Sequence, residues 1–71
     1  MVTDQQRRLL VFIKRATEDR HGTPPSYREM MRGIGLASTH GVTRLLNGLE
    51  ERGYIRRLPN RARAIEIIRM P

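Results

Sequence analysis

Four hydrogen-bonding side chains recur at helical spacing in the middle of the chain, and only one of them carries a full charge: His40, Thr43, Arg44 and Asn47. A helix face that meets only water is usually rich in charged residues, so this composition indicates a face that contacts another molecule. Side chains of these types donate and accept hydrogen bonds at base edges in the major groove of duplex DNA. We therefore interpret this face as a DNA-reading surface.

The element that must carry these side chains is a helix over residues 38–52. Its inner face is predicted by an apolar stripe at positions i, i+3, i+4 and i+7, formed by Val42, Leu45, Leu46 and Leu49. Ser38 is expected to cap the helix with its hydroxyl, and Gly53 to end it in a left-handed conformation. Gly41 and Gly48 are expected on the polar side, where Gly41 would let the first turn approach another surface.

Catalytic chemistry is not expected. Ser38 and His40 lie at a helix start where the serine serves as a cap, and two histidines without cysteine in separate elements make a poor metal site. Glu50 and Glu51 are neighbours, not carboxylates opposed across a cleft, and are expected to interact with arginines such as Arg57. The sequence predicts a protein that is not an enzyme and needs no cofactor or metal. The alternative for His40 is a helix residue that is simply exposed to water.

Size and charge narrow the class of protein. The 71 residues are expected to form one domain, residues 1–71, with 14 basic against 7 acidic residues and a net charge of +7. All basic residues except Lys14 are arginine, which pairs bidentately with phosphate and guanine and so favours a nucleic-acid partner. The alternative is that the charge only keeps the protein dissolved. There is no cysteine, and the longest apolar run, Leu9–Ile13, is too short to span a membrane, so a cytoplasmic protein is expected.

Two further helices should precede the reading helix. Thr3 and Gln6 have capping-box spacing and predict a helix from about Asp4 to Arg20, with Leu9, Leu10, Phe12, Ile13 and Ala16 on its buried side. Ser26 and Glu29 repeat the spacing and predict a short second helix from Tyr27, which we expect Gly33-Ile34-Gly35 to break. A short helix, a glycine-containing turn and a longer helix make a helix-turn-helix.

The end of the chain has strand-like periodicity. Residues 54–58 and 64–68 are predicted strands, joined by turn residues 59–62. Four arginines surround this turn and favour a loop that contacts phosphates: Arg56, Arg57, Arg61 and Arg63. The predicted fold class is therefore mainly α with a small β-hairpin, a three-helix winged helix-turn-helix.

The stretch GLASTHGVTRLLNGLEERGYIRRLPNRARAIEIIRMP resembles the N-terminal DNA-binding domain of LexA-type repressors. The upstream segments TPPSYREM and TDQQRRLLVFI are similar to the same family, so the likeness covers nearly the whole chain. The resemblance implies a winged helix-turn-helix that binds a palindromic operator as a dimer and represses DNA-damage (SOS) genes. It also implies a bacterial or phage cytoplasm, at the nucleoid.

The resemblance places base-reading positions on Ser38, His40, Gly41, Thr43 and Arg44, and the same face adds two more, Thr39 and Asn47. Expected contacts to the DNA backbone, from the second helix and the wing, come from Ser26, Arg28, Arg56, Arg57, Asn60, Arg61 and Arg63. The reading positions depart from any one LexA type, so no operator sequence is implied. LexA-type repressors continue into a self-cleaving domain that also dimerises them, and this sequence stops at Pro71. It is either a domain cut at its boundary or a free-standing protein, with a monomer or weak dimer expected in solution.

Two other binding functions compete with duplex-DNA reading. A winged helix can instead be a protein-protein interaction module, for which the only apolar patch residues available are Tyr54, Leu58 and Ile68. Single-stranded nucleic acid needs aromatic platforms for stacking, and the chain has only three aromatic residues.

Overall fold

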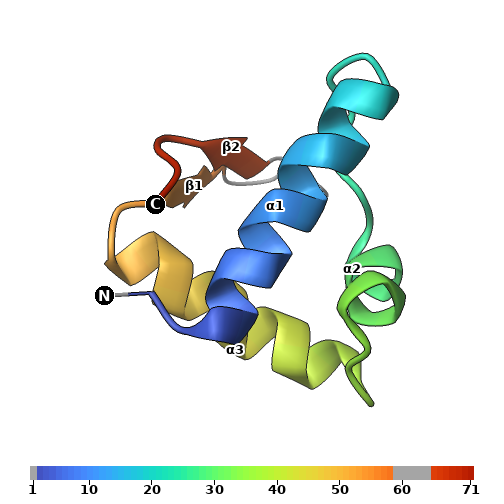
Figure 1. Ribbon diagram of the computed structural model, residues 1–71, viewed down its shortest axis with the longest axis vertical. Helices are drawn as coiled ribbons and strands as arrows, with labels where there is room; N and C mark the ends of the chain where they lie inside the picture. Colours follow the sequence, from blue (N-terminus) through green and yellow to red (C-terminus); the bar gives the residue numbers. More distant parts are fainter. Residues whose placement is uncertain (1, 59–64) are drawn as a thin grey trace.

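The computed structural model describes residues 2–58 and 65–71, which form helices followed by an antiparallel hairpin (Figure 1). The helices are α1 (Asp4–Asp19), α2 (Tyr27–Ile34) and α3 (Thr39–Glu51), and the strands are β1 (Ile55–Arg57) and β2 (Ile65–Ile67). α1 and α2 both pack on α3, and β1 packs on α3 as well. The predicted fold class, a winged helix-turn-helix that is mainly helical, is confirmed.

Both predicted capping boxes are present. Thr3 Oγ1 accepts a hydrogen bond of 3.1 Å from the Gln6 main-chain nitrogen, and Gln6 Oε1 accepts one of 2.9 Å from Thr3. Ser26 and Glu29 make the equivalent pair at 3.1 and 2.8 Å. Each box satisfies two helix N–H groups that have no partner within the helix, which fixes where α1 and α2 begin.

The predicted break within Gly33-Ile34-Gly35 falls at its last residue, because α2 continues through Ile34 and ends at Gly35, which adopts the left-handed conformation at φ 75°. Gly33 serves a packing purpose instead. A Cβ atom at position 33 would lie 2.2 Å from Cε1 of Phe12, so the absence of a side chain lets the ring rest on the α2 backbone. Gly33 therefore lets α1 and α2 pack closely, and it does not itself end α2.

The two ends of α3 differ in how they are capped. Ser38 occupies the N-cap position, but its side chain makes no capping hydrogen bond, so the predicted hydroxyl cap is wrong. At the other end Gly53 has φ 77°, and two main-chain bonds of 3.0 Å run from Gly53 to Glu50 and from Tyr54 to Leu49. This is a Schellman motif, which caps the last carbonyls of the helix and confirms the predicted stop.

A single apolar core lies where the helices and β1 meet. Its buried side chains come from every helix and from the first strand: Leu9, Leu10, Ile13, Met30, Ile34, Val42, Leu46, Leu49 and Ile55. The predicted stripe of α3 is confirmed, with Leu45 only partly buried at its edge. Phe12, which was expected to face inward, is only partly buried, and so is Met31. This stripe faces α1 and α2, which leaves the opposite side of α3 at the surface.

Gly48 is the point where α3 approaches α1. A Cβ atom there would lie 2.6 Å from Nε2 of the buried Gln6, and one at Gly41 would lie 3.3 Å from Cδ1 of Leu36. The prediction that both glycines belong to the outer polar face is therefore wrong, since both positions are directed at neighbouring parts of the fold. Gly48 permits close packing of two helices.

The hairpin is shorter than predicted but in the expected place. β1 and β2 pair antiparallel with Ile55 opposite Ile67 and Arg57 opposite Ile65. The ladder is extended by a bond of 2.8 Å from the Ile68 nitrogen to the Tyr54 carbonyl. The predicted turn, residues 59–62, lies outside the described residues.

The ion pair between Arg20 and Glu29, outside the core, should make the stability of the folded state depend on pH. The guanidinium of Arg20 donates to Glu29 and, together with the capping bonds from Ser26, lowers the pKa of Glu29 from 4.5 to about 2. A carboxylate whose pKa is depressed by folding stabilises the folded state above its unfolded pKa, and this contribution is lost as pH falls from 4.5 to about 2.

Glu29→Gln should keep the capping box, because glutamine also serves at that position, and lose the ion pair. We expect the variant to be less stable than wild type at neutral pH and equal to it near pH 2, measured by chemical unfolding followed by circular dichroism. A stability difference that does not change with pH would contradict this assignment.

Candidate nucleic-acid interface

The outer face of α3 is a continuous exposed polar surface. Because the apolar stripe is turned to the core, the side chains of Ser38, Thr39, His40, Thr43, Arg44 and Asn47 are all exposed, while Gly41 is partly covered by Leu36. No ion pair within residues 2–58 and 65–71 involves Arg44, so its guanidinium is available to a ligand. The geometry brings the predicted base-contacting side chains together on one helix face. Gly41 is the exception, since it is directed at Leu36.

The hydroxyl groups of Thr43 and Ser38 on this face differ in the hydrogen bonds that they already make. Thr43 Oγ1 donates to the Thr39 carbonyl at 3.3 Å, so the Thr43 hydroxyl retains its acceptor capacity but has used its proton. The Ser38 hydroxyl is not used by a cap and can both donate and accept. The start of α3 therefore offers an unengaged hydroxyl at the edge of the surface.

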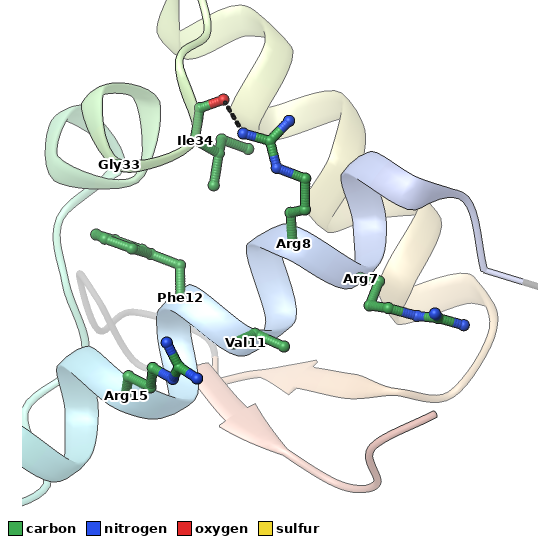
Figure 2. A pocket seen from close by; sticks show the side chains of 7 residues that line it. All are labelled: Arg7, Arg8, Val11, Phe12, Arg15, Gly33 and Ile34. Carbon is green, nitrogen blue, oxygen red and sulfur yellow. Dashed lines mark hydrogen bonds between the residues drawn. The ribbon is translucent and has the colours of Figure 1, made fainter.

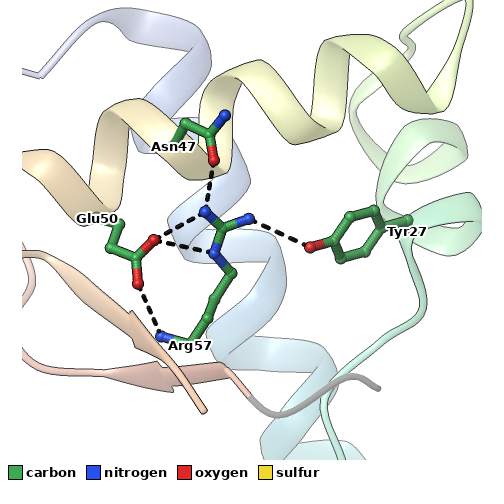
Figure 3. Close-up of polar contacts among 4 residues, drawn as sticks. All are labelled: Tyr27, Asn47, Glu50 and Arg57. Atoms are coloured by element: carbon green, nitrogen blue, oxygen red, sulfur yellow. Dashed lines mark hydrogen bonds and ion pairs between the residues drawn. The ribbon is translucent and has the colours of Figure 1, made fainter. Parts of the chain in front are cut away.

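A cluster of four polar residues connects α3 to β1 and to the start of α2 (Figure 3), and we call it the Arg57 cluster: Tyr27, Asn47, Glu50 and Arg57. Arg57 Nε and Nη2 donate to Glu50 Oε1 at 3.1 and 2.8 Å, and the Arg57 main-chain nitrogen donates to Glu50 Oε2 at 3.2 Å. Arg57 Nη1 donates to the Tyr27 hydroxyl at 3.4 Å, and Nη2 also donates to Asn47 Oδ1. The expected pairing of Glu50 with Arg57 is confirmed.

The electrostatics of the cluster follow from these bonds. Hydrogen bonds from the Arg57 side chain and then from its main chain lower the pKa of Glu50, and the bond to Glu50, with a second to Tyr27, raises the pKa of Arg57. Both groups are therefore charged at neutral pH, and the pair is charge-assisted. Arg57 thus holds β1 against α3.

The wing arginines divide into those with internal partners and those outside the described residues. Arg56 pairs with Glu66 directly across the hairpin, although its side chain stays 61% exposed. Arg69 lies over the ring of Tyr54, 4.5 Å from the ring centroid, and donates to the Arg52 carbonyl at 3.0 Å. The predicted contacts Asn60, Arg61 and Arg63 lie outside the described residues.

The predicted backbone contacts on α2 lie at its N-terminus. Arg28 is exposed, and Ser26 is half-buried with its hydroxyl already accepting from the Glu29 nitrogen. Any contact from Ser26 to a phosphate therefore uses the donor capacity of that hydroxyl.

The structure also has a pocket of about 350 Å³ between α1 and α2 (Figure 2). It is lined by Arg7, Arg8, Val11, Phe12, Arg15, Gly33 and Ile34, and none of these is a predicted DNA contact. Arg8 Nη2 donates to the Ile34 carbonyl at 3.3 Å, which satisfies a carbonyl at the end of α2.

Among the described residues, no group of three or more acidic or histidine side chains is arranged to hold a metal ion. Nor does any helix in this part of the chain have the length and hydrophobicity to cross a membrane.

Sequence reasoning missed Tyr27 and did not foresee that Asn47 would be bound by Arg57. Glu50 follows Asn47 by one helical turn, so the two share a side of α3, and this spacing was the available signal. Tyr27 is 30 residues from Arg57, and nothing local connects them.

A comparison with known protein families agrees with this geometry. The family described as LexA DNA binding domain matches residues 1–64, a span that includes all three helices and β1. The resemblance seen in the sequence is therefore confirmed over most of the chain. This chain belongs to the LexA DNA binding domain family.

Proposed function

We propose that this protein is a sequence-specific regulator of transcription, a repressor without enzymatic activity, that reads duplex DNA with α3 in the major groove. The observation that carries the proposal is the outer face of α3, where hydrogen-bonding side chains with a single full charge are exposed from Thr39 to Asn47. An α-helix fits the major groove, and such side chains distinguish base pairs there. Membership of a DNA-binding family supports the same function. The corresponding location is the cytoplasm, at the nucleoid.

The contacts divide by what they do. Ser38, Thr39, His40, Thr43, Arg44 and Asn47 are proposed to face bases, and Gly41 is left out because it is directed at Leu36. Arg28, Ser26, Arg56, Asn60, Arg61 and Arg63 are proposed to contact the backbone, which positions the helix without reading sequence. We assign Arg57 to holding the reading helix, because its donors are already directed at Glu50, Asn47 and Tyr27.

The experiment that tests this function is selection of bound sites from a random duplex library. Recovery of one enriched motif is expected, and its symmetry would give the half-site spacing. Binding without enrichment of any sequence would overturn the proposal.

The alternative, a winged helix that binds protein with only non-specific DNA affinity, requires a contiguous apolar patch. Leu58 and Ile68 are 42% and 55% exposed, but the strand register places Ile68 opposite Tyr54 and Leu58 beyond the other end of the ladder. Tyr54 is covered by Arg69. These residues do not form one surface, so the geometry favours DNA.

Assembly gives a further prediction. We expect a monomer or weak dimer in solution that pairs on a palindromic operator, because two modules on one DNA raise the effective concentration of the second. Binding should be cooperative on a full site and much weaker on a half-site, measured by sedimentation of the free protein and titration of both sites at matched salt. A tight dimer in free solution would contradict this expectation.

For the wing we expect Arg61→Ala and Arg63→Ala each to weaken operator and random duplex alike, and to lower the salt slope of binding by roughly one. Each substitution removes one phosphate contact and so one released counterion. Arg15→Ala, an exposed arginine on α1, is the matched control and should leave the slope unchanged. An unchanged slope in both wing variants would mean that the hairpin turn does not touch DNA.

A further inference from the structure

The orientation of one amide on the reading surface is determined by its neighbour. Asn47 is exposed on α3, and its Oδ1 accepts a hydrogen bond from Arg57 Nη2 (Figure 3). A guanidinium has only donors, so an amide nitrogen turned toward Arg57 would place donor against donor. The oxygen must therefore face Arg57, and the nitrogen of Asn47 lies on the side away from it.

Arg57 can impose this orientation because it is itself fixed. Glu50 holds Nε and Nη2 at 3.1 and 2.8 Å, and the Tyr27 hydroxyl accepts from Nη1 at 3.4 Å. Glu50 also accepts from the main chain of Arg57 at 3.2 Å, which ties both ends of the residue to one carboxylate. Only 27% of the Arg57 side chain is exposed, against 61% for Arg56. The partner of Asn47 is thus a held group rather than a mobile side chain.

An asparagine that reads adenine bidentately needs its oxygen and its nitrogen together, one for the N6 amino group and one for N7. Here Arg57 occupies one lone pair of the oxygen and holds that atom on its own side, so the amide presents its two N–H donors on the side away from Arg57. Guanine presents two neighbouring acceptors, O6 and N7, and thymine presents O4. Adenine keeps the N7 acceptor but carries an amino donor in place of O6, and cytosine presents only an amino donor. Donors facing donors are unfavourable, so a donor-only amide discriminates between these two pairs of bases.

We propose that Asn47 reads one operator position as a donor only, preferring guanine or thymine over adenine or cytosine, with Arg57 and Glu50 as positioning residues. This inference rests on the proposed function, since it needs α3 to lie in the major groove. It adds a specific preference that exposure of Asn47 alone does not imply.

The test is site selection from a random duplex library with wild type and two variants. Asn47→Asp keeps the shape and the acceptor that faces Arg57 but replaces the donors with an acceptor. We expect the preference for guanine or thymine at one position to fall about tenfold, with adenine or cytosine gaining. The base preference is the readout, because the added negative charge lowers affinity for every sequence.

Arg57→Lys keeps the charge, but a compact ammonium cannot bind Glu50, Asn47 and Tyr27 in the same planar arrangement. We expect the same operator position to admit adenine about as well as guanine, since the amide is then able to turn, while the other positions stay unchanged. Arg15→Lys, at an exposed position of α1 where no DNA contact is proposed, is the matched control and should leave the motif unchanged. Thermal unfolding by circular dichroism shows whether each variant is folded.

The outcomes separate this inference from the function on which it rests. If wild type enriches no motif, the proposed function fails. If wild type enriches a motif and Asn47→Asp weakens all sequences equally, Asn47 contacts phosphate and the donor-only reading is overturned. If Asn47→Asp changes one position but folded Arg57→Lys changes none, the positioning role of Arg57 is overturned.

Discussion

Truncation of Leu46 to alanine is expected to lower the free energy of unfolding by about 2–5 kcal/mol, the usual loss for a buried leucine. Leu46 is fully buried in the stripe by which α3 packs on the core. A chain of 71 residues has a total stability of roughly 4–11 kcal/mol at the usual amount per residue, so the loss is a large part of the whole. Urea unfolding followed by circular dichroism measures it.

Leu45→Ala is the matched control for this prediction. Leu45 is the neighbouring residue on α3 and the same in type, but it is only partly buried, so its truncation removes less buried surface and should cost less. Operator affinity of Leu46→Ala should fall with the folded fraction, while the salt slope stays at the wild-type value, because no phosphate contact is lost. Equal losses for the two leucines would contradict the packing described for α3.

The sequence predicted the elements whose signals are local. Thr3 with Gln6 and Ser26 with Glu29 determine where two helices begin, because each capping box closes within four residues. The stripe of α3 predicted which face is buried, and hence which side chains are exposed, from helical periodicity alone. These signals were sufficient for the fold class and for the position of the exposed polar face of α3.

The predictions for Gly33 and Gly48 failed because the role of each glycine depends on a residue distant in sequence. Gly33 was expected to break α2 together with Ile34 and Gly35, yet it remains helical and lies against the ring of Phe12, which is 21 positions earlier in the chain. Gly48 was placed on the outer face, but Gln6 of α1 lies against it. A glycine in a helix looks the same in sequence whether it breaks the helix or admits a neighbour.

On the outer face of α3, too, features set by local sequence could be predicted and features set by distant partners could not. Exposure of Thr43, Arg44 and Asn47 could be predicted from spacing, because it depends on α3 alone. The orientation of the Asn47 amide could not be predicted, because it depends on Arg57. Arg57 is held in turn by Glu50 and by Tyr27 of another helix. Arg57 was expected both to contact phosphate and to pair with Glu50, but the bonds from Arg57 to Tyr27 and Asn47 could not be read from the sequence.

Arg44→Ala is expected to relax base preference within the half-site by about 1–3 kcal/mol at one position, the usual value of a bidentate contact between arginine and guanine. Arg44 is exposed on the second turn of α3, beside Thr43 and opposite the buried stripe, and takes part in no ion pair within the described residues. Its five donors are therefore available to a base edge. Competition between the selected operator and its single-base variants, at fixed salt, measures the discrimination.

Arg7→Ala separates loss of a specific contact from loss of charge. Arg7 is an exposed arginine on α1 that lines the pocket between α1 and α2, where no DNA contact is proposed, so its removal lowers net charge by the same amount. We expect Arg7→Ala to keep the wild-type ranking of operator variants, with at most a small uniform loss of affinity through the weaker overall field. Arg44→Ala should instead bind the operator and its variant at one position almost equally. If Arg44→Ala weakens operator and random duplex by the same factor, Arg44 contacts only phosphate, and base reading by the second turn of α3 is wrong.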